Sequence, residues 1–302
     1  MNTRAIRTLV AIFTALSSLP ALAQRDFSEV RIETVPLGSG LYVLIGSGGN
    51  IGLATGDDGA FVIDDQFAPL TDKIRTAIAA VTERDVQFVL NTHWHGDHTG
   101  GNENFADAGA LIVAHDNTRT RMQSEQFVRI FEHSAAPAPA GALPVVTFAS
   151  EMTFHWNGKT IRGFHVEHAH TDGDVIVQFV EDDVFHMGDT FWTSGYPRID
   201  AGNGGNVKGV IAAARAVLSR AGENARIIPG HGAVPDAGTG TLESYLAMLE
   251  NTADAVQKLV DRGLDEEAAV AARPTAAFDA EWGQGYVSPE RFVRSLWVSL
   301  AE

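Results

Sequence analysis

The stretch NTHWHGDHTGG, residues 91–101, concentrates side chains that can bind a metal ion. Three of the eleven histidines of the chain and one aspartate fall within six positions, at His93, His95, Asp97 and His98. Imidazole and carboxylate are ligands that zinc accepts in proteins. The run directly follows VQFVL, an apolar segment typical of a buried strand. A loop at the end of such a strand can turn these side chains toward one point, so the spacing predicts a metal site.

Three further candidate ligands lie at the ends of other apolar segments. They are His170 in HAHTDGD, Asp189 in HMGDT and His231 in IPGHG. Ligands converge at such strand ends in α/β sheets, where loops gather at one edge. The chain has no cysteine, so histidine and acidic side chains must supply every ligand. Seven donors are too many for one tetrahedral ion and suit two ions.

The elements that position these side chains follow from hydrophobic patterning and turn signals. Apolar runs bounded by turn residues predict strands at residues 40–46, 50–55, 59–64, 86–91, 110–115, 152–156, 160–170, 174–180, 183–189 and 225–230. Helices are predicted at residues 70–82, 116–126, 239–261, 265–272 and 289–300, and another helix ends near residue 220. Asp116 or Asn117 is the predicted cap of the second of these helices.

Two strand-rich halves, each followed by helices, indicate the fold class. LATGDDGAFVIDD in the first half and VQFVEDDVFHMGD in the second share a plan of strand, acidic turn, apolar strand and aspartate. The Pro/Ala-rich segment 135–144 predicts an exposed connector between the halves rather than a flexible tether. We predict an α/β fold in which two sheets pack face to face with helices outside, as a single domain over residues 24–302.

The first 23 residues have the layout of a secretory signal peptide. Arg4 and Arg7 precede an apolar run, and Ala21–Ala23 offer a small-residue cleavage site before Gln24. An ordinary N-terminal anchor helix is the alternative. The signal peptide predicts a periplasmic or secreted protein. No later segment has the about 18 apolar residues that a membrane span needs, so no span is predicted.

The formal net charge of the chain is −16. Such a charge repels phosphate backbones, so nucleic acid is not an expected partner. A small-molecule substrate is the expected partner, and the sequence does not predict an oligomeric state.

The ligand blocks THWHGDH, HTDGD, GD and PGHG occur in the order found in the metallo-β-lactamase superfamily, which the chain resembles from about residue 30 to at least residue 245. The resemblance implies the four-layer αβ/βα sandwich of that family, with a dinuclear site where the two sheets meet. The implied ligands are, for the first metal, His93, His95 and His170 and, for the second, Asp97, His98 and His231. Asp189 resembles the aspartate that bridges both metals in glyoxalase II and lactonase relatives. Two Zn²⁺ ions are the expected cofactors, with iron or manganese as alternatives.

The resemblance predicts a dinuclear zinc hydrolase, and the signal peptide predicts that it is exported. A hydroxide shared by the two metals would attack a cyclic amide or ester, with a β-lactamase-like activity as the first choice. A lactonase or a glyoxalase II-type thioesterase is the alternative. A metal-binding protein without turnover and a nuclease fit less well. Asp97 would orient the hydroxide or carry a proton to the leaving atom.

Residues 200–218 are similar to a loop and helix of class B β-lactamases in which an asparagine helps to hold the carbonyl oxygen. Asn203 or Asn206 could take that role, although both are equally suited to turns beside glycine. The segment Gly46–Asn50 occupies the place of a mobile flap over the substrate in those enzymes.

The chain departs from one branch of those β-lactamases in ways that favour glyoxalase II and lactonases. That branch has cysteine in place of Asp189 and arginine in place of His98. It also has a substrate-binding lysine where this chain has Trp192, and Arg198 is the nearest cation that could replace it. An apolar wall for the substrate, or else packing of the loop, is predicted for Phe191, Trp192 and Tyr196.

The sequence leaves the roles of several other residues open. His168 lies two residues before His170, so both would share one face of a strand, but the threonine after His170 favours His170 as the ligand. His186 is predicted to pack in the core or to support the site. Asp64 either orients a ligand histidine by a hydrogen bond or caps a turn. Structural or exposed positions are predicted for His115, His133, His155 and His165.

Overall fold

The computed structural model describes residues 26–301. The predicted signal peptide, residues 1–23, lies outside this range and stays a prediction. Within the described range, no helix is long and apolar enough to cross a membrane.

The first half of the chain forms a seven-stranded sheet. Across the sheet the strands are β1 (Glu33–Gly38), β2 (Leu41–Ile45), β3 (Ile51–Ala54), β4 (Ala60–Ile63), β5 (Val86–Leu90), β6 (Leu111–His115) and β9 (Val146–Phe148). Strands β1 to β4 pair antiparallel, and β4, β5, β6 and β9 run parallel. Every residue of β3 and β4 is buried, as expected for strands that are covered on both faces.

The second half forms a five-stranded sheet. Its strands, in order, are β10 (Glu151–Trp156), β11 (Lys159–His165), β12 (Val175–Phe179), β13 (Val184–His186) and β14 (Arg226–Ile228). Neighbours pair antiparallel except β13 and β14, which are parallel. The two similar sequence segments form the β3–β4 and β12–β13 hairpins, one in each sheet.

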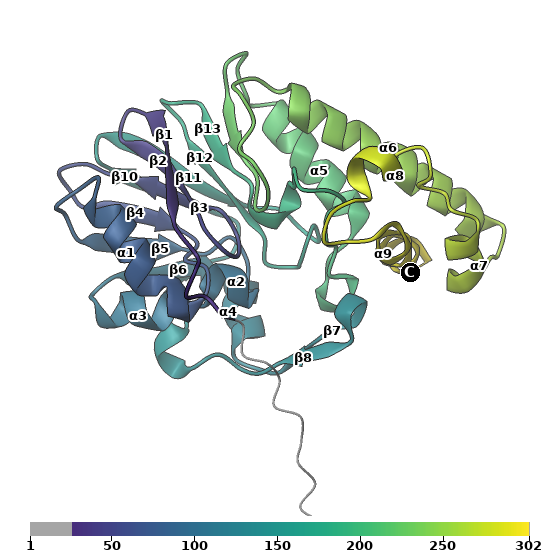
Figure 1. The fold of residues 1–302 in the computed structure, drawn as a ribbon, viewed down its shortest axis with the longest axis horizontal. Helices are drawn as coiled ribbons and strands as arrows, with labels where there is room; N and C mark the ends of the chain where they lie inside the picture. The colour runs from purple at the N-terminus through teal and green to yellow at the C-terminus, as the bar shows by residue number, and fades with distance from the viewer. Residues whose placement is uncertain (1–25, 302) are drawn as a thin grey trace, which may run out of the picture.

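Helices cover the outer faces of both sheets. The α-helices are α1 (Thr71–Ala79), α2 (Gly96–Thr99), α3 (Asn102–Asp107), α4 (Asp116–Met122), α5 (Val207–Leu218), α6 (Gly240–Asp261), α7 (Glu266–Ala271), α8 (Asp279–Trp282) and α9 (Pro289–Ala301). The 3₁₀ helices are η1 (Ala68–Leu70), η2 (Arg129–Phe131), η3 (Ala140–Ala142), η4 (Gly188–Thr190) and η5 (Ala201–Asn203). In Figure 1, α1 and α3 lie on one side of the sheets, and α5, α6 and α9 lie on the other.

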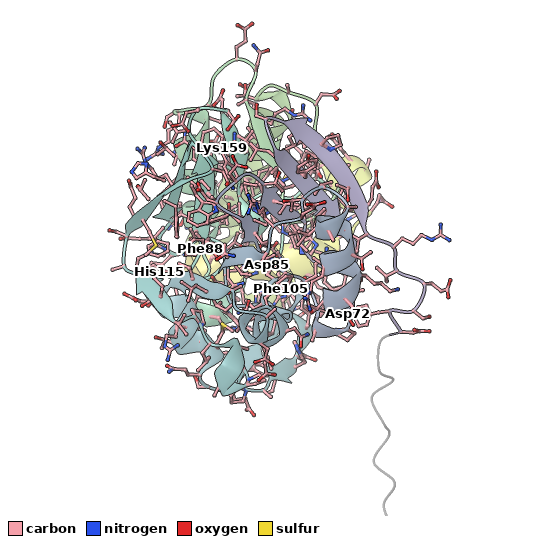
Figure 2. All side chains as sticks on the ribbon, turned by 90° about the vertical axis from the view of Figure 1, so that its left-hand side faces the viewer. Asp72, Asp85, Phe88, Phe105, His115 and Lys159 are labelled. Atoms are coloured by element: carbon pink, nitrogen blue, oxygen red, sulfur yellow. The ribbon has the colours of Figure 1, made fainter. Side chains whose placement is uncertain are left out.

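Three apolar layers hold the sandwich together. Phe61 and Phe179 belong to the core between the two sheets. Phe105 of α3 packs with buried residues of the first sheet, and Tyr245 of α6 packs with Phe185 of the second sheet. In Figure 2, which looks onto the face of α1 and α3, the labelled Phe105 lies below Lys159 of the second sheet. The layers therefore run helix, sheet, sheet, helix, which confirms the predicted four-layer fold.

The predicted elements differ from the structure at several places, including the end of β11, the cap of α4 and segments that were not predicted. Strand β11 ends at His165 rather than at residue 170, because His168 has a φ of 47° and the chain turns. The N-cap of α4 is His115, whose Nδ1 accepts from the backbone N–H of Asn117, so neither predicted cap is used. A small hairpin, β7 (Gln126–Val128) with β8 (His133–Ala135), was not predicted.

Candidate metal centre

The seven side chains predicted as metal ligands meet at one edge of the two sheets. Each lies in a segment that follows the carboxyl end of β5, β11, β13 or β14. These strand ends therefore place the seven side chains close together. Their ligand atoms form two groups, each within 4.8 Å. The first ligand group is His93, His95, His170 and Asp189, and the second ligand group is Asp97, His98 and His231.

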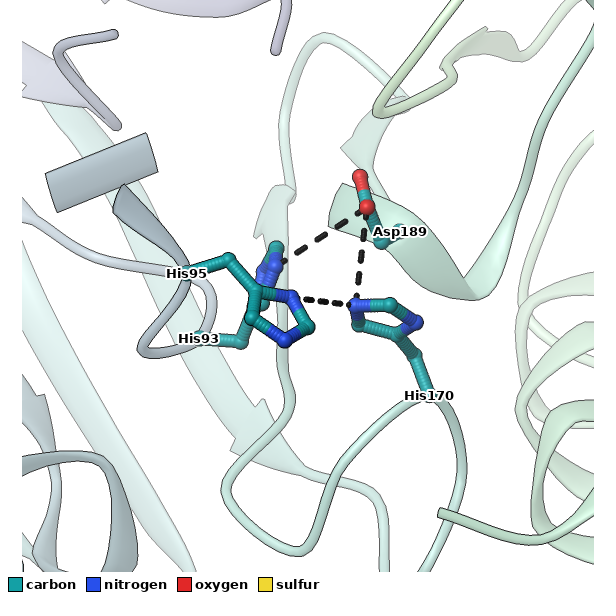
Figure 3. Close-up of side chains that lie close together, drawn as sticks. All are labelled: His93, His95, His170 and Asp189. Carbon is teal, nitrogen blue, oxygen red and sulfur yellow. Dashed lines mark hydrogen bonds and ion pairs between the residues drawn. The ribbon is translucent and has the colours of Figure 1, made fainter. Parts of the chain in front are cut away.

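The carboxylate of Asp189 lies between the two groups. Its Oδ2 is 3.8 Å from Nε2 of His93 and 3.5 Å from Nε2 of His170. Its Oδ1 is 3.1 Å from Nε2 of His98 and 3.4 Å from Nε2 of His231. Figure 3 shows this carboxylate facing the imidazoles of the first group. One oxygen therefore serves each group, which is the arrangement that a bridging ligand requires.

Asp64 fixes the ring orientation of one histidine in each group. Its Oδ2 lies 2.7 Å from Nδ1 of His98 and accepts from the hydroxyl of Thr92 at 2.8 Å. Because that hydroxyl donates its proton to Asp64, its oxygen can accept from Nδ1 of His93, 3.0 Å away. Both imidazoles then keep Nε2 free to bind a cation. The structure thus favours the ligand-orienting role of Asp64 over a turn cap.

The segment Arg198–Asp200 fixes the other two histidines of the first group. Nδ1 of His170 donates to the carbonyl oxygen of Arg198 at 2.7 Å, and Nε2 of His95 lies 2.9 Å from Oδ2 of Asp200. Nη2 of Arg198 lies 2.7 Å from the same nitrogen of His95. A guanidinium can only donate, so Asp200 is the partner that leaves Nδ1 of His95 free for a cation.

Burial keeps the three histidines of the first group neutral in the absence of metal. It lowers the pKa of His93 and His95 well below the usual range, and the charge of Arg198 adds to the effect on His95. It also lowers the pKa of His170 to about 4, despite the opposing charge of Asp189. Neutral imidazoles expose the lone pairs that a metal needs.

Carboxylates have the opposite effect on the second group. Burial alone would lower the pKa of His231, but the charges and hydrogen bonds of Asp189 and Asp97 together outweigh burial and raise it to about 9. The same balance, with Asp189 and Asp64 as the main charges, raises the pKa of His98. In turn, the histidines hold the pKa of Asp97 and of Asp189 below the usual range, although burial acts the other way. The second group therefore carries protons that a bound cation would displace.

The cluster opens to solvent on the side of the second group. The side chains of Asp97 and His231 are 24% and 19% exposed, whereas those of the first group are at most 4% exposed. The buried ring of Trp192 packs against His231, with the ring centroids 4.4 Å apart. A substrate would therefore approach over Asp97 and His231.

The donor set fits divalent metal ions. Among the described residues, no atom hydrogen-bonds to the buried Nε2 of His93 or to Oδ1 of Asp189, which such ions would satisfy. Nε2 of His98 and Nε2 of His231 face each other at 3.3 Å. Nitrogen and carboxylate donors of this kind suit zinc, iron or manganese.

Neither asparagine predicted to hold a carbonyl oxygen is available for that role. The amide of Asn203 donates to both carboxylate oxygens of Asp200 and to the carbonyl of Phe127. Asn206 is the N-cap of α5, where its Oδ1 accepts from the backbone N–H of Lys208. These contacts favour structural roles for both residues over the predicted contact with a carbonyl oxygen. Asn203 supports the partner of His95, and Asn206 begins a helix.

The predicted flap and aromatic wall also take other positions. The segment Gly46–Asn50 packs against Asp97 and His98 and does not form a free flap. Phe191 and Tyr196 are fully buried in the core under α6 and α9, so only Trp192 of the predicted wall lies beside the cluster. Arg198, considered for substrate binding, is engaged with His95 and Asp200.

The remaining histidines lie outside the two groups. His168 is exposed and its Nδ1 is 3.0 Å from the carbonyl oxygen of Gly204, so the structure favours His170 over it as a ligand. His186 is buried and contacts the carbonyl oxygen of Asn50. His115 and His165 stack on each other with ring centroids 3.8 Å apart, and the exposed positions are His133 and His155.

Sequence reasoning missed Thr92, Asp200 and the carbonyl of Arg198. These groups act only through the ligand histidines, and nothing in their residue type marks that role. The one local signal is the position of Thr92, directly beside His93 in the ligand run.

Comparison with known proteins agrees with the predicted family and fold. Residues 44–231, more than half of the chain, match the metallo-β-lactamase superfamily. A hydroxyacylglutathione hydrolase from Polaromonas sp. strain JS666 is 28% identical over 169 residues, which cover 54% of this chain and 55% of that protein. The chain thus aligns with only about half the length of this curated relative.

Solved structures with the same fold are more distant in sequence. A metallo-β-lactamase from Pontibacter korlensis superimposes with a TM-score of 0.59 at 20% identity, covering 73% of this chain and 100% of that chain. The metallo-β-lactamase DIM-1 gives a TM-score of 0.57 at 18% identity, covering 74% and 99%. The family match and the His/Asp cluster together establish that this chain belongs to the metallo-β-lactamase superfamily of hydrolases.

Proposed function

We propose that this protein is an exported hydrolase that holds two zinc ions and cleaves the carbonyl–heteroatom bond of a cyclic amide or ester. The observation that supports this most directly is the carboxylate of Asp189, which offers one oxygen to each ligand group. The first group and Asp189 would hold one ion, and the second group with Asp189 would hold the other. Two ions at such a site supply Lewis acidity and a water of lowered pKa.

The side chains of the protein perform the orienting work. Asp64, Thr92 and Asp200 set the tautomers of three ligand histidines, so that each presents a lone pair to the centre. Asp97 is the most exposed ligand, and its Oδ2 lies 3.3 Å from Nε2 of His231. From this position Asp97 can orient the attacking water and pass its proton to the leaving atom. The chain needs no serine or cysteine nucleophile for this chemistry.

A thioesterase is the second candidate. The chain has Asp189 and His98 where one branch of β-lactamases has cysteine and arginine, and one curated relative is a hydroxyacylglutathione hydrolase. The amide of Asn203 is engaged with Asp200, which removes one feature that favoured a β-lactam. The two candidates share the metal centre and differ in the substrate.

A substrate panel on metal-quantified protein tests the proposal. Purified protein reconstituted with zinc is assayed against a chromogenic β-lactam, an aliphatic lactone, a glutathione thioester and a phosphodiester. We expect turnover of a β-lactam or a lactone, and loss of that turnover when a chelator removes the zinc. Turnover of the thioester alone would favour the second candidate. Absence of turnover across the panel in protein that carries two zinc ions would overturn the proposal.

Export is a separate part of the proposal, based on residues 1–23. Mass spectrometry of the protein from the periplasm of an expressing bacterium should find a chain that begins at Gln24. An uncleaved chain in the membrane fraction would support the anchor-helix alternative instead.

A further inference from the structure

Three consecutive residues between β2 and β3 contact Asp97, His98 and the backbone on either side of His231. They are Gly48, Gly49 and Asn50, which we call the β2–β3 turn. The turn lies in the first sheet, whereas β14, which leads into His231, lies in the second sheet. It therefore joins the two sheets at the metal centre.

The two glycines allow the turn to lie against Asp97 and His98. The backbone N–H of Gly49 donates to the carbonyl oxygen of Asp97 at 3.0 Å. A Cβ on Gly49 would lie 2.1 Å from Cε1 of His98, so no larger residue fits without displacing that ring. Gly48 has a φ of 112°, a conformation that favours glycine.

Asn50 holds the loop that carries His231. Its side-chain Nδ2 donates to the carbonyl oxygen of Pro229 at 3.0 Å and to that of Gly232 at 2.9 Å, one on each side of His231. Its backbone N–H donates to the carbonyl oxygen of Gly230 at 2.7 Å. The residue is only 3% exposed, so water cannot readily replace these bonds.

Asn50 is itself held in place by His186. His186 lies with Nε2 2.9 Å from the carbonyl oxygen of Asn50, and its Nδ1 accepts from the backbone N–H of Gly188. Gly188 begins η4, which carries Asp189. Asn50 and His186 thus connect the loop of His231, through Gly188, to the 3₁₀ helix that carries Asp189.

We infer that Asn50 is a positioning residue for the second metal ion, which acts by clamping the backbone on both sides of His231. The inference rests on the proposed two-ion function. It predicts a selective effect, because the histidines of the first group are oriented by Thr92, Asp200 and the carbonyl of Arg198 instead.

Metal stoichiometry provides a readout that a general loss of stability would not mimic. Asn50→Asp keeps the size of the side chain but replaces both N–H donors with an oxygen that faces two carbonyl oxygens. Asn50→Ser keeps one donor and should give an intermediate effect. Asn251→Asp is the matched control, because its exposed amide on α6 donates to the carbonyl of Ala247, one turn earlier in the same helix.

Metal-free wild-type and variant proteins are titrated with zinc against a chromophoric chelator, and folding is checked by circular dichroism. We expect two ions per wild-type chain. In Asn50→Asp the first ion should bind as in wild type, and the second should bind about 10–100-fold more weakly, as is usual for loss of a group that orients a ligand. The Asn251→Asp control should match wild type.

The outcomes separate the inference from the function on which it rests. A wild-type chain that binds one zinc ion would overturn the two-ion proposal itself. A wild-type chain that binds two, with Asn50→Asp and Asn50→Ser binding both equally well or losing both equally, would overturn the role of Asn50. If Asn50→Asp does not fold, Asn50→Ser decides by the same criteria.

Discussion

The two ligand groups differ in their access to solvent. The first group is closed, with His93, His95 and His170 almost fully buried. The second group is open at Asp97 and His231, although its third member, His98, is buried. An ion in the first group would be held where water cannot compete, and an ion in the second group would meet the substrate. The comparison suggests that the first ion mainly shapes the site and that the second lies where the substrate enters.

The groups also differ in charge before a metal binds. Burial lowers the pKa of the histidines in the first group, while the carboxylates around the second group raise the pKa of His98 and His231. The first group is ready to bind a cation, and the second must release protons first. Burial and neighbouring charge, acting on the same side chain, therefore give opposite results a few ångströms apart.

Asp189 is the residue that joins the groups, so its replacement tests the comparison most severely. Asp189→Asn keeps the shape but removes the charge that both groups face. We expect both ions to bind more weakly, by more than the roughly 10–100-fold loss seen for groups that only orient a ligand, and hydrolysis to fall with them. Zinc titration and the rate of hydrolysis are measured on the same samples. A variant that still bound both ions as wild type does would show that Asp189 does not bridge them.

Asp200 offers a way to weaken the first group alone. Asp200→Ala removes the acceptor of Nε2 of His95 and leaves Arg198, which can only donate, beside that nitrogen. We expect the first ion to bind about 10–100-fold more weakly while the second is little affected. The same zinc titration measures this, with the exposed Asp254→Ala on α6 as the control. Equal weakening of both ions would contradict the separate support of the two groups.

The pH dependence of zinc binding should distinguish the groups without any mutation. Protons compete for His231 at every pH below its pKa of about 9, so the second ion should bind more tightly as the pH rises toward 9. Each displaced proton contributes about tenfold per pH unit. His170, with a pKa of about 4, meets no such competition near neutral pH. Titrations at several pH values from slightly acidic to slightly basic measure both slopes. If the affinities for the two ions changed equally with pH, the proposed difference in protonation between the two groups would be wrong.

The ligands and the fold could be predicted because their signals are local. Residue type and position after an apolar strand identified His93, His170 and His231, and the two similar hairpins indicated two sheets. The supports could not be found in this way. Asn50 and Asp200 reach their partners only when segments more than 100 residues apart are packed together. No periodicity or spacing in the chain encodes such a contact.

The predicted aromatic wall failed for a related reason. Phe191, Trp192 and Tyr196 look alike in the sequence, but the chain after η4 passes under the helices of the second half. Phe191 packs against Tyr245 and Tyr196 stacks on Phe292, and Trp192 is buried in the same core, although its ring also contacts His231. Which aromatic side chain stays beside the metal centre depends on helices that are far away in the sequence.

Asn203 provides the smallest expected effect and separates two roles for one residue. If Asn203 held the carbonyl oxygen of the substrate, Asn203→Ala would lower kcat by about 10²–10³ at unchanged zinc content. The structure instead has its amide on Asp200, so we expect the first ion to bind only severalfold more weakly, within the lower part of the roughly 10–100-fold range for orienting groups. At saturating zinc, kcat should then return close to the wild-type value.

Asn206→Ala is the matched control for this last test. Its side chain caps α5 and also bonds to the carbonyl oxygen of Ser299, so its loss should cost about 1 kcal/mol of stability and leave zinc binding unchanged. Thermal unfolding and zinc titration compare the two variants in stability and in affinity for the first ion. If Asn203→Ala behaved like Asn206→Ala, with lower stability and unaltered affinity for the first ion, the amide of Asn203 would have no part in holding Asp200 against His95. Asp200 would then hold His95 without help from Asn203.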